Sequence, residues 1–242
     1  MKLLIDIGNT RLKWALARDG MFAEHGAVLH EGEPARVIGA LPAARVESAW
    51  LAHVTGAAHE ESLCAAVHAH YGVATQIART APAWQGLRNA YREPQRLGVD
   101  RWLAMVAAWH EARGAACVID AGTALTADAI AADGRHLGGI IAAGLETQQR
   151  AVLGATRFAT RSFESAYDGG FGDDTETCVR QGAMLACLGA IDRARLLAGP
   201  AALCLLTGGD ATMLLPYLGD GWTHRPFLVL EGLRALSENA HS

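Results

Sequence analysis

The hydrophobic pattern at the start of the chain is a short apolar run followed by a segment with a period of two. Lys2 to Ile7 is a short apolar run, and in Arg11 to Ala17 every second residue is a large apolar one. Such alternation is typical of half-buried strands. Gly8-Asn9 between the two runs suits the positive φ of a tight turn, so the pattern predicts a β-hairpin. A third strand is predicted through Met21 to Leu29.

Further along the first half, helical and strand patterns alternate. The predicted helices lie near Glu33–Leu41 and His59–Tyr71, and the predicted strands near Ala49–Val54 and Val73–Ile77. From Arg79 to Pro94 the pattern is that of a loop, which is followed by the segment Leu97–Arg101 and an amphipathic helix through Ala112. Alternating helices and strands predict an α/β fold.

The second half repeats the opening pattern. Leu4 to Thr10 and Val118 to Ala124 each contain an apolar strand, an Asp at its end, a Gly two residues on and a Thr close behind. The repeat predicts two related halves. The remaining predicted elements are strands near Ala115–Ile119, Leu125–Ala131, His136–Ile141 and Ala202–Leu206, and helices from about Leu145, over Asp174–Leu197 and over Glu231–Glu238. Thr160 to Asp173 is irregular and rich in Gly, which predicts an exposed connection or lid.

Composition excludes several classes of protein. The 242 residues are 51% hydrophobic and 19% charged, which excludes a disordered chain. With 21 basic and 25 acidic residues and no basic run, the chain lacks the charge pattern of a nucleic-acid binder. The five Cys and ten His show no zinc-ligand spacing, so we expect reduced thiols and histidines that are solvated or singly bonded. Without a signal peptide or membrane-spanning run, we expect a cytoplasmic protein.

The two repeated loops carry candidate chemistry. Gly8 and Gly122 let backbone N–H groups approach phosphate oxygens, and the carboxylates of Asp6 and Asp120 could hold a hydrated cation. A single Asp-x-Gly-x-Thr segment is often an ordinary turn, but its repetition after matching strands favours a phosphate site.

A third glycine segment, Thr207-Gly208-Gly209-Asp210, follows a buried strand and opens a predicted helix. It could be a structural helix cap through Asp210 or a flat wall for a purine. The sequence has neither Gly-x-x-x-x-Gly-Lys-Ser/Thr nor Gly-x-Gly-x-x-Gly, which argues against a P-loop or Rossmann site. A nucleotide site built from the three glycine segments therefore accounts for them all.

Five motifs, in their order and approximate spacing, resemble those of type III pantothenate kinases over nearly the whole chain. They are Asp6-Ile7-Gly8-Asn9-Thr10, Gly98-Val99-Asp100-Arg101, Asp120-Ala121-Gly122-Thr123-Ala124, Gly138 to Gly144, and Thr207-Gly208-Gly209-Asp210. Ala143 stands where that family usually has Pro, which bears on the rigidity of its loop.

The resemblance implies a fold and an assembly. The family belongs to the superfamily of acetate and sugar kinases, heat-shock chaperones and actin. Its members have two ribonuclease-H-like domains with mixed sheets around an ATP cleft, and they act as homodimers. On this basis we expect domains at 1–114 and 115–228, with a C-terminal helix at about 229–240 that packs on the first domain.

The resemblance also implies the reaction, which is transfer of the ATP γ-phosphoryl group to pantothenate in the first step of coenzyme A synthesis. Asp6 would hold Mg²⁺ and Asp120 a monovalent cation, K⁺ or NH₄⁺. The residues expected to contact ATP are Asp6, Ile7, Gly8, Asn9, Thr10, Arg11, Leu12, Lys13, Gly122, Thr123, Gly208 and Gly209.

For pantothenate, the resemblance implies that Asp100 is the catalytic base and that Thr175 reaches the substrate from the partner subunit. The expected contacts are Tyr91, Gly98, Val99, Asp100, Arg101 and Thr175. Residues of these types also serve purely structural roles. Asp100 and Arg101 could form a surface ion pair at a helix start, Tyr91 could anchor a loop, and Thr175 could cap a helix.

Two other functions fit parts of the sequence. A nucleotide-binding transcriptional accessory protein could keep the ATP loops without an acceptor site. A phosphatase of the same superfamily would need a group that positions water. Asp100 and Arg101 are required only by the kinase, and the acidic charge balance gives no DNA-binding surface, so the sequence favours the kinase.

Overall fold

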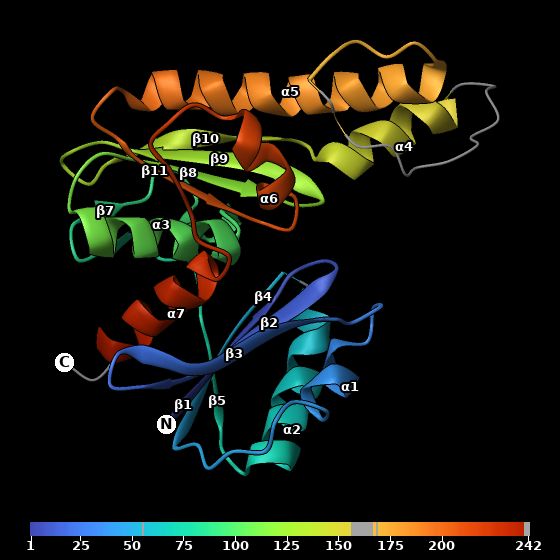
Figure 1. Ribbon diagram of the computed structural model, residues 1–242. Coiled ribbons are helices and arrows are strands. Elements are labelled where there is room, and N and C mark those ends of the chain that lie inside the picture. Colours follow the sequence, from blue (N-terminus) through green and yellow to red (C-terminus); the bar gives the residue numbers. More distant parts are fainter. Residues whose placement is uncertain (55, 156–166, 168, 240–242) are drawn as a thin grey trace. The chain divides into compact units, whose positions relative to one another are not determined.

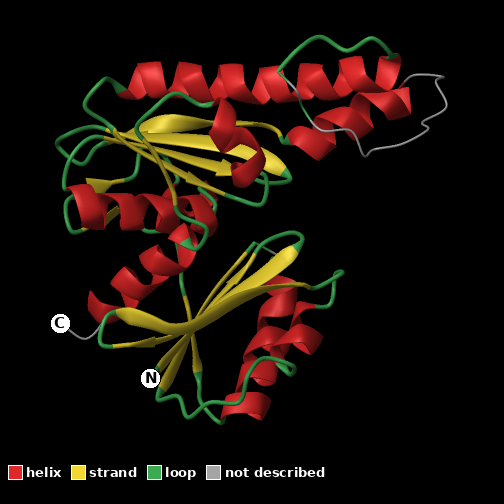
Figure 2. Ribbon diagram, viewed as in Figure 1, coloured by secondary structure: helices red, strands yellow, loops and turns green. Residues whose placement is uncertain are grey.

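The computed structural model describes residues 1–54, 56–155, 167 and 169–239 (Figure 2). The chain divides into two compact units, one formed by Met1–Glu111 with Phe227–Ser242 and the other by Ala112–Pro226. Each unit has its own five-stranded sheet.

The sheet of the first unit has the strand order β3-β2-β1-β4-β5. Its strands are β1 (Lys2–Ile7), β2 (Arg11–Arg18), β3 (Met21–Leu29), β4 (Ser48–His53) and β5 (Thr75–Ile77). β1 pairs antiparallel with β2 and parallel with β4, so the sheet is mixed. Ile7 is in register with both Leu12 and His53, so the loops after β1 and β4 leave the same edge of the sheet.

Helices α1 (Pro34–Ile38) and α2 (Glu60–Tyr71) cover one face of this sheet (Figure 1). Ile38 and Leu63 are fully buried against a core that includes Leu3 and Ile5. α2 ends at Gly72, whose left-handed φ of 72° lets its N–H bond the carbonyl oxygen of His68. The predicted strands and helices of this half are confirmed, although α1 is shorter than expected.

The helices α3 (Val99–Ala112) and α7 (Leu228–Asn239) approach each other closely. A Cβ atom at Gly232 would lie 1.9 Å from the backbone oxygen of Leu103, so only glycine fits between the two backbones. α7 also contacts β1, β2 and β4, and therefore joins the end of the chain to its beginning.

The segment Arg79 to Pro94, expected to be a loop, contains a small hairpin of β6 (Ala83–Trp84) and β7 (Leu87–Arg88), followed by the 3₁₀ turn η2 (Pro94–Arg96). Gln85 and Gly86 both have positive φ, and Trp109 Nε1 donates to the oxygen of Gln85 at 2.9 Å. Two-residue strands are too short to give a periodic pattern, and a long-range contact to Trp109 supports this hairpin.

The second unit has the strand order β10-β9-β8-β11-β12, which repeats the topology of the first. Its strands are β8 (Ala116–Ala121), β9 (Ala124–Ile130), β10 (His136–Ala143), β11 (Leu203–Thr207) and β12 (Trp222–His224). The antiparallel pairs of β8, β9 and β10 and the parallel pairs of β8, β11 and β12 make it a mixed sheet. The predicted fold class, with two mixed sheets flanked by helices, is confirmed; β12 was not predicted.

The long helix α5 (Thr175–Ala198) lies over one face of the second sheet, with α4 (Leu145–Ala155) beside it (Figure 1). Met184 and Ile191 of α5 pack on Ile119 and Leu206 of the sheet. The short segments α6 (Ala211–Leu214) and η3 (Leu215–Tyr217) follow β11, and η1 (Ala57–His59) precedes α2.

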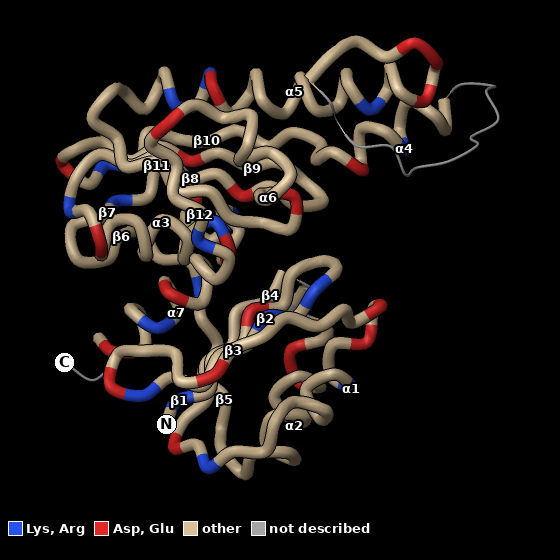
Figure 3. The backbone as a smooth tube through the Cα atoms, viewed as in Figure 1, with Lys and Arg blue, Asp and Glu red and all other residues tan. Residues whose placement is uncertain are grey.

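The predicted lid at Thr160–Asp173 falls mostly outside the described residues, because 160–166 and 168 are not among them. Basic and acidic residues are interspersed along the described chain (Figure 3). Among the helices of the described residues, none has both the length and the apolar character that a bilayer crossing requires.

Candidate functional site

The loop that follows β1 is closed by a hydrogen bond from the N–H of Gly8 to the oxygen of Arg11 at 3.0 Å. Asp6, only 7% exposed, lies in β1 and is the cross-strand partner of Lys13 in β2. Neither Gly8 nor Asn9 has a positive φ, so the expected left-handed turn is wrong. The loop spans more residues than a two-residue turn, because Ile7 and Leu12 are the last pair, and it therefore needs no left-handed residue.

A buried histidine that sequence reasoning missed touches this loop. His30 Nε2 lies 2.9 Å from the oxygen of Gly8, and His30 Nδ1 accepts from the N–H of Gly32 at 3.2 Å. His30 is therefore doubly bonded, in contrast to the solvated or singly bonded state expected for the histidines. No local signal marks it, because its partner Gly8 is distant in sequence.

The loop that follows β8 is built in the same way. The N–H of Gly122 donates to the oxygen of Ala124 at 3.0 Å. The oxygen of Thr123 accepts from the N–H of Gly144 at 3.0 Å and from the Thr147 hydroxyl at 2.7 Å. A Cβ atom at Gly144 would lie 1.9 Å from the oxygen of Gly122, so this glycine is required by close backbone approach.

Two of the predicted residues of the second loop lie near its ends. Asp120 is half-buried in β8, opposite Thr126 of β9. Ala143, which stands in place of a family proline, is the last residue of β10 and pairs with Ala124. Its oxygen accepts from Gln148 Nε2 at 2.7 Å, so α4 and β10 are tied together at this end of the loop.

Gly208 and Gly209 have different environments. Gly208 has a φ of 100°, and a Cβ atom there would lie 2.2 Å from the oxygen of Ala121. A Cβ atom at Gly209 would meet nothing within 4 Å. Gly208 is thus needed to bring the chain against β8, whereas Gly209 borders open space.

Asp210 occupies the N-cap position of α6, but its side chain makes no capping hydrogen bond to that helix, so the structural alternative of a cap through Asp210 is wrong. Burial raises the pKa of Asp210, and the Glu146 carboxylate adds to the shift, while the N–H of Leu145 opposes it. The Asp210 carboxyl group therefore interacts with groups at the start of α4 and does not cap α6.

The Gly98-Val99-Asp100-Arg101 segment forms the first turn of α3. Asp100 Oδ1 accepts from the N–H of Arg101 at 2.8 Å. A Cβ atom at Gly98 would lie 2.5 Å from Asp100 Oδ1, so the glycine leaves room for the carboxylate. The carboxylate is half-buried at a helix N-terminus, where the helix dipole favours a negative charge.

The structure brings Arg101 and Tyr91 together. Arg101 Nη1 donates to the Tyr91 hydroxyl at 3.0 Å, and the guanidinium carbon lies 5.8 Å from the centre of the tyrosine ring. Arg101 is only 8% exposed, so a surface ion pair is the wrong description of this arginine. Tyr91 is itself held by a hydrogen bond from its N–H to Asn89 Oδ1 at 2.9 Å.

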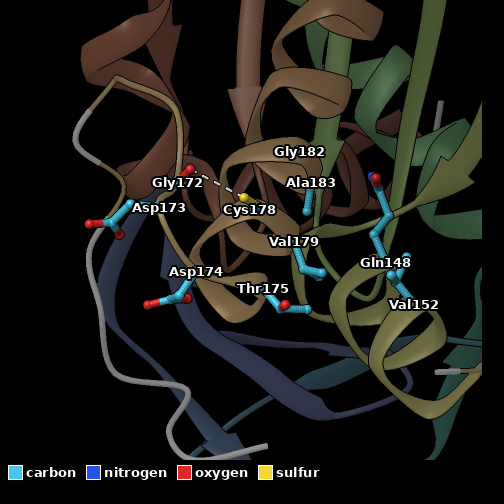
Figure 4. A pocket seen from close by; sticks show the side chains of 10 residues that line it. All are labelled: Gln148, Val152, Gly172, Asp173, Asp174, Thr175, Cys178, Val179, Gly182 and Ala183. Carbon is cyan, nitrogen blue, oxygen red and sulfur yellow. Dashed lines mark hydrogen bonds between the residues drawn. The ribbon is translucent and has the colours of Figure 1, made fainter. Parts of the chain in front are cut away.

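Thr175 belongs to the second unit and lies at the start of α5 (Figure 4). The N-cap is Asp174, whose Oδ1 accepts from the N–H of Thr177 at 2.7 Å, so the capping role considered for Thr175 is wrong. Thr175 lines a cavity of about 650 Å³ together with Gln148 and Val152 of α4. The cavity leaves space for a ligand group or another chain next to Thr175.

Within the described residues, no three or more His, Cys, Asp or Glu side chains come close enough together to hold a metal ion. Mg²⁺ commonly takes only one or two protein carboxylates and fills its other positions with water or phosphate oxygens. Asp6, nearly buried beside the Gly8 loop, is a suitable single carboxylate.

Comparison with known proteins gives consistent results. A family model described as type III pantothenate kinase matches residues 2–195. A type III pantothenate kinase of Nitrosococcus oceani is 35% identical over 259 residues, which cover 99% of this chain and 94% of that protein.

Solved structures with lower identity share the fold. One, assigned to the Baf family of transcriptional activators of Campylobacter jejuni, superposes with a TM-score of 0.66 at 20% identity, covering 99% of this chain and 100% of that one. The ethanolamine utilization protein EutJ of Carboxydothermus hydrogenoformans gives 0.57 at 12% identity, covering 97% and 89%. At these identities the likeness concerns the fold alone.

Proposed function

The chain belongs to the type III pantothenate kinase family, and we propose that it transfers the γ-phosphoryl group of ATP to the primary hydroxyl group of pantothenate, with Asp100 as the base. The observation that carries the assignment of Asp100 is the state of its carboxylate. Oδ1 is held by the N–H of Arg101, and Oδ2 has no hydrogen-bond partner in the described part of the chain.

In the reaction, the hydroxyl oxygen of pantothenate forms a bond to the γ-phosphorus while the bond from that phosphorus to the ADP oxygen breaks. Asp100 Oδ2 orients the hydroxyl and accepts its proton as the bond forms, and the proton then passes to solvent. Because phosphoryl transfer needs little covalent chemistry from the protein, alignment and charge neutralisation supply most of the rate enhancement.

Arg101 and Tyr91 bind pantothenate in this proposal. Pantothenate carries a carboxylate, and a buried guanidinium binds such a group through charge-assisted hydrogen bonds. The Tyr91 hydroxyl accepts from Arg101 Nη1, which aligns the guanidinium before the substrate arrives. Gly98 and Val99 complete the turn that presents Asp100.

For ATP, we propose that the loop from Asp6 to Lys13 binds phosphate oxygens through backbone N–H groups and the Asn9, Thr10 and Lys13 side chains. In the second unit, Gly122 and Thr123 do the same, and the open face of Gly209 contacts the base. Gly208 supports Gly209 by its contact with Ala121. Asp6 would hold Mg²⁺ and Asp120 a monovalent cation, and both ions would neutralise phosphate charge.

We further propose a homodimer in which Thr175 contacts the pantothenate bound by the partner subunit. Support comes from the environment of Thr175, which lines an open cavity between α4 and α5. Val152 and Leu185 on these helices are exposed apolar residues of the kind that a subunit interface covers.

A coupled ADP-release assay with ATP, Mg²⁺ and K⁺, run with and without pantothenate, tests the proposal. We expect ADP release that depends on pantothenate, together with phosphopantothenate detected by mass spectrometry. Phosphate release without an acceptor would favour a phosphatase. Nucleotide binding without turnover would favour a regulatory protein.

A further inference from the structure

His30 connects the end of β3 to the loop that follows β1. The side chain is only 4% exposed, and both ring nitrogens are bonded to backbone groups. Nε2 lies 2.9 Å from the oxygen of Gly8, and Nδ1 lies 3.2 Å from the nitrogen of Gly32. A buried imidazole with two backbone partners is held in one orientation.

The two partners determine the protonation of the ring. The N–H of Gly32 can only donate, so Nδ1 must lack a proton. The oxygen of Gly8 can only accept, so Nε2 must carry the proton. The His30 ring therefore donates a hydrogen bond from Nε2 to the Gly8 loop.

The backbone of His30 is bonded to the same loop. Its N–H donates to the oxygen of Thr10 at 3.2 Å, and its oxygen accepts from the N–H of Glu33 at 2.6 Å. One residue thus bonds two carbonyl groups of the loop, those of Gly8 and Thr10.

These bonds determine which way the loop presents its amides. In a planar trans peptide the C=O and N–H groups point in opposite directions. Because the oxygen of Gly8 points at the His30 ring, the N–H of Asn9 points away from it. The bond to His30 Nε2 holds the Gly8–Asn9 peptide in this direction.

We propose that His30 is a positioning residue for nucleotide binding, which holds the Gly8–Asn9 peptide so that its N–H faces a phosphate oxygen of the nucleotide. This inference rests on the proposed function of the Gly8 loop. His30 itself touches neither the nucleotide nor pantothenate.

Two conservative variants distinguish the contribution of the hydrogen bond at Nε2 from that of the hydrogen bond at Nδ1. In His30→Gln the amide nitrogen can take the place of Nε2 and donate to Gly8, but the acceptor for Gly32 is lost. In His30→Asn the side chain reaches only as far as Nδ1, so it can accept from Gly32 but cannot reach Gly8. His70→Asn is the matched control, because His70 Nε2 bonds the oxygen of Leu41 at 2.9 Å in the same unit.

For each variant we would measure ADP binding by calorimetry and the KM for ATP by enzyme kinetics. Thermal unfolding monitors whether the variant is folded. We expect His30→Asn to weaken ADP binding and raise the KM for ATP about three- to tenfold, the effect of one lost hydrogen bond. The KM for pantothenate should not change. His30→Gln and His70→Asn should bind ADP as the wild type does.

The proposal is overturned if His30→Asn binds ADP normally, or if His30→Gln loses as much affinity as His30→Asn, since the lost bond to Gly32 would then be responsible. Hydrogen exchange of the loop amides gives a readout that does not need activity. Faster exchange at Asn9 in His30→Asn, but not in His30→Gln, is expected, and equal exchange in both would contradict the proposal. A wild type that binds ADP but does not phosphorylate pantothenate would reject the proposed function while leaving this test intact; a wild type that binds no nucleotide would reject both.

Discussion

Arg101 Nη1 donates a 3.0 Å hydrogen bond to the hydroxyl of Tyr91, although one residue lies in the first turn of α3 and the other in the preceding loop. The guanidinium also lies over the tyrosine ring, at 5.8 Å from its centre. The two side chains are therefore held together, and the tyrosine orients the arginine.

Replacing the Tyr91 hydroxyl tests this relationship. Tyr91→Phe keeps the ring contact but removes the acceptor, so we expect the KM for pantothenate to rise about three- to tenfold with the KM for ATP unchanged. Arg101→Lys should have a larger effect because the planar fork is lost. Tyr71→Phe is the control, since its hydroxyl bonds the oxygen of Pro42 elsewhere in the same unit. Equal effects of the Tyr91 and Tyr71 variants would contradict the prediction.

Removing the charge of Asp100 tests whether this residue is the catalytic base. Asp100→Asn should lower kcat by about a hundredfold or more while ATP still binds, because general-base catalysis typically contributes that much. Gly98→Ala should also lower kcat, since its methyl group would lie 2.5 Å from Asp100 Oδ1 and must displace the carboxylate. Gly154→Ala in α4, where a Cβ meets nothing within 4 Å, is the control. Near-normal turnover of Asp100→Asn would reject its role as base.

The adjacent glycines Gly208 and Gly209 should respond differently to alanine. Gly208→Ala should lower the melting temperature strongly, because the methyl group would lie 2.2 Å from the oxygen of Ala121 and the φ of 100° is unfavourable. Gly209→Ala should fold normally but raise the KM for ATP, because the space beside it is taken by nucleotide in the proposed complex. Thermal unfolding and kinetics of both variants check this, and a normal KM for Gly209→Ala would exclude contact with the nucleotide.

The proposed cation at Asp120 predicts a dependence on monovalent ions. Activity should rise when Na⁺ is replaced by K⁺ or NH₄⁺, because a bound cation neutralises phosphate charge. Asp120→Asn should lose this response. Asp133→Asn, which alters a carboxylate in an exposed turn of the same unit, should keep it. A wild type that is indifferent to the three ions would argue against the site.

Two carboxylates should affect the pH dependence of stability in opposite directions. Hydrogen bonds from Arg79 and His53 hold the pKa of Glu60 below 4.5, so its stabilising contribution is present above that value and is lost as the pH falls through the lowered pKa. Burial raises the pKa of Asp210 above 3.8, so its charged form destabilises the fold once the pH exceeds the raised pKa.

Melting temperatures measured between acid and neutral pH check both signs. Glu60→Gln should melt lower than the wild type at pH 7, and Asp210→Asn should melt higher, with both differences shrinking in acid. A lower melting temperature of Asp210→Asn at pH 7 would show that the attraction of the charged carboxylate to the Leu145 N–H outweighs the cost of burying the charge.

The sequence alone determined the longer strands, most helices and the two repeated loops, but not the short strands β6, β7 and β12. The alternation in Arg11 to Ala17 is typical of a strand, and the continuous apolar run that ends at Asp120 is typical of a strand buried on both faces; both patterns are visible within a few residues. The two segments in which an Asp is followed by Gly two residues on and by a nearby Thr likewise indicated two related halves, and the two sheets have equivalent strand orders.

Only the tertiary structure decided how these loops are supported. His30 contacts Gly8 from the end of another strand, Gly144 is required by the oxygen of Gly122, and Trp109 holds the unpredicted hairpin at Gln85. Each contact joins residues about 20 or more positions apart. Local conformational propensity depends on residues that are neighbours along the chain. The direction of a buried polar side chain depends instead on the distant backbone groups with which it forms hydrogen bonds. For that reason the sequence could indicate the two glycine loops but not the buried histidine that is bonded to one of them.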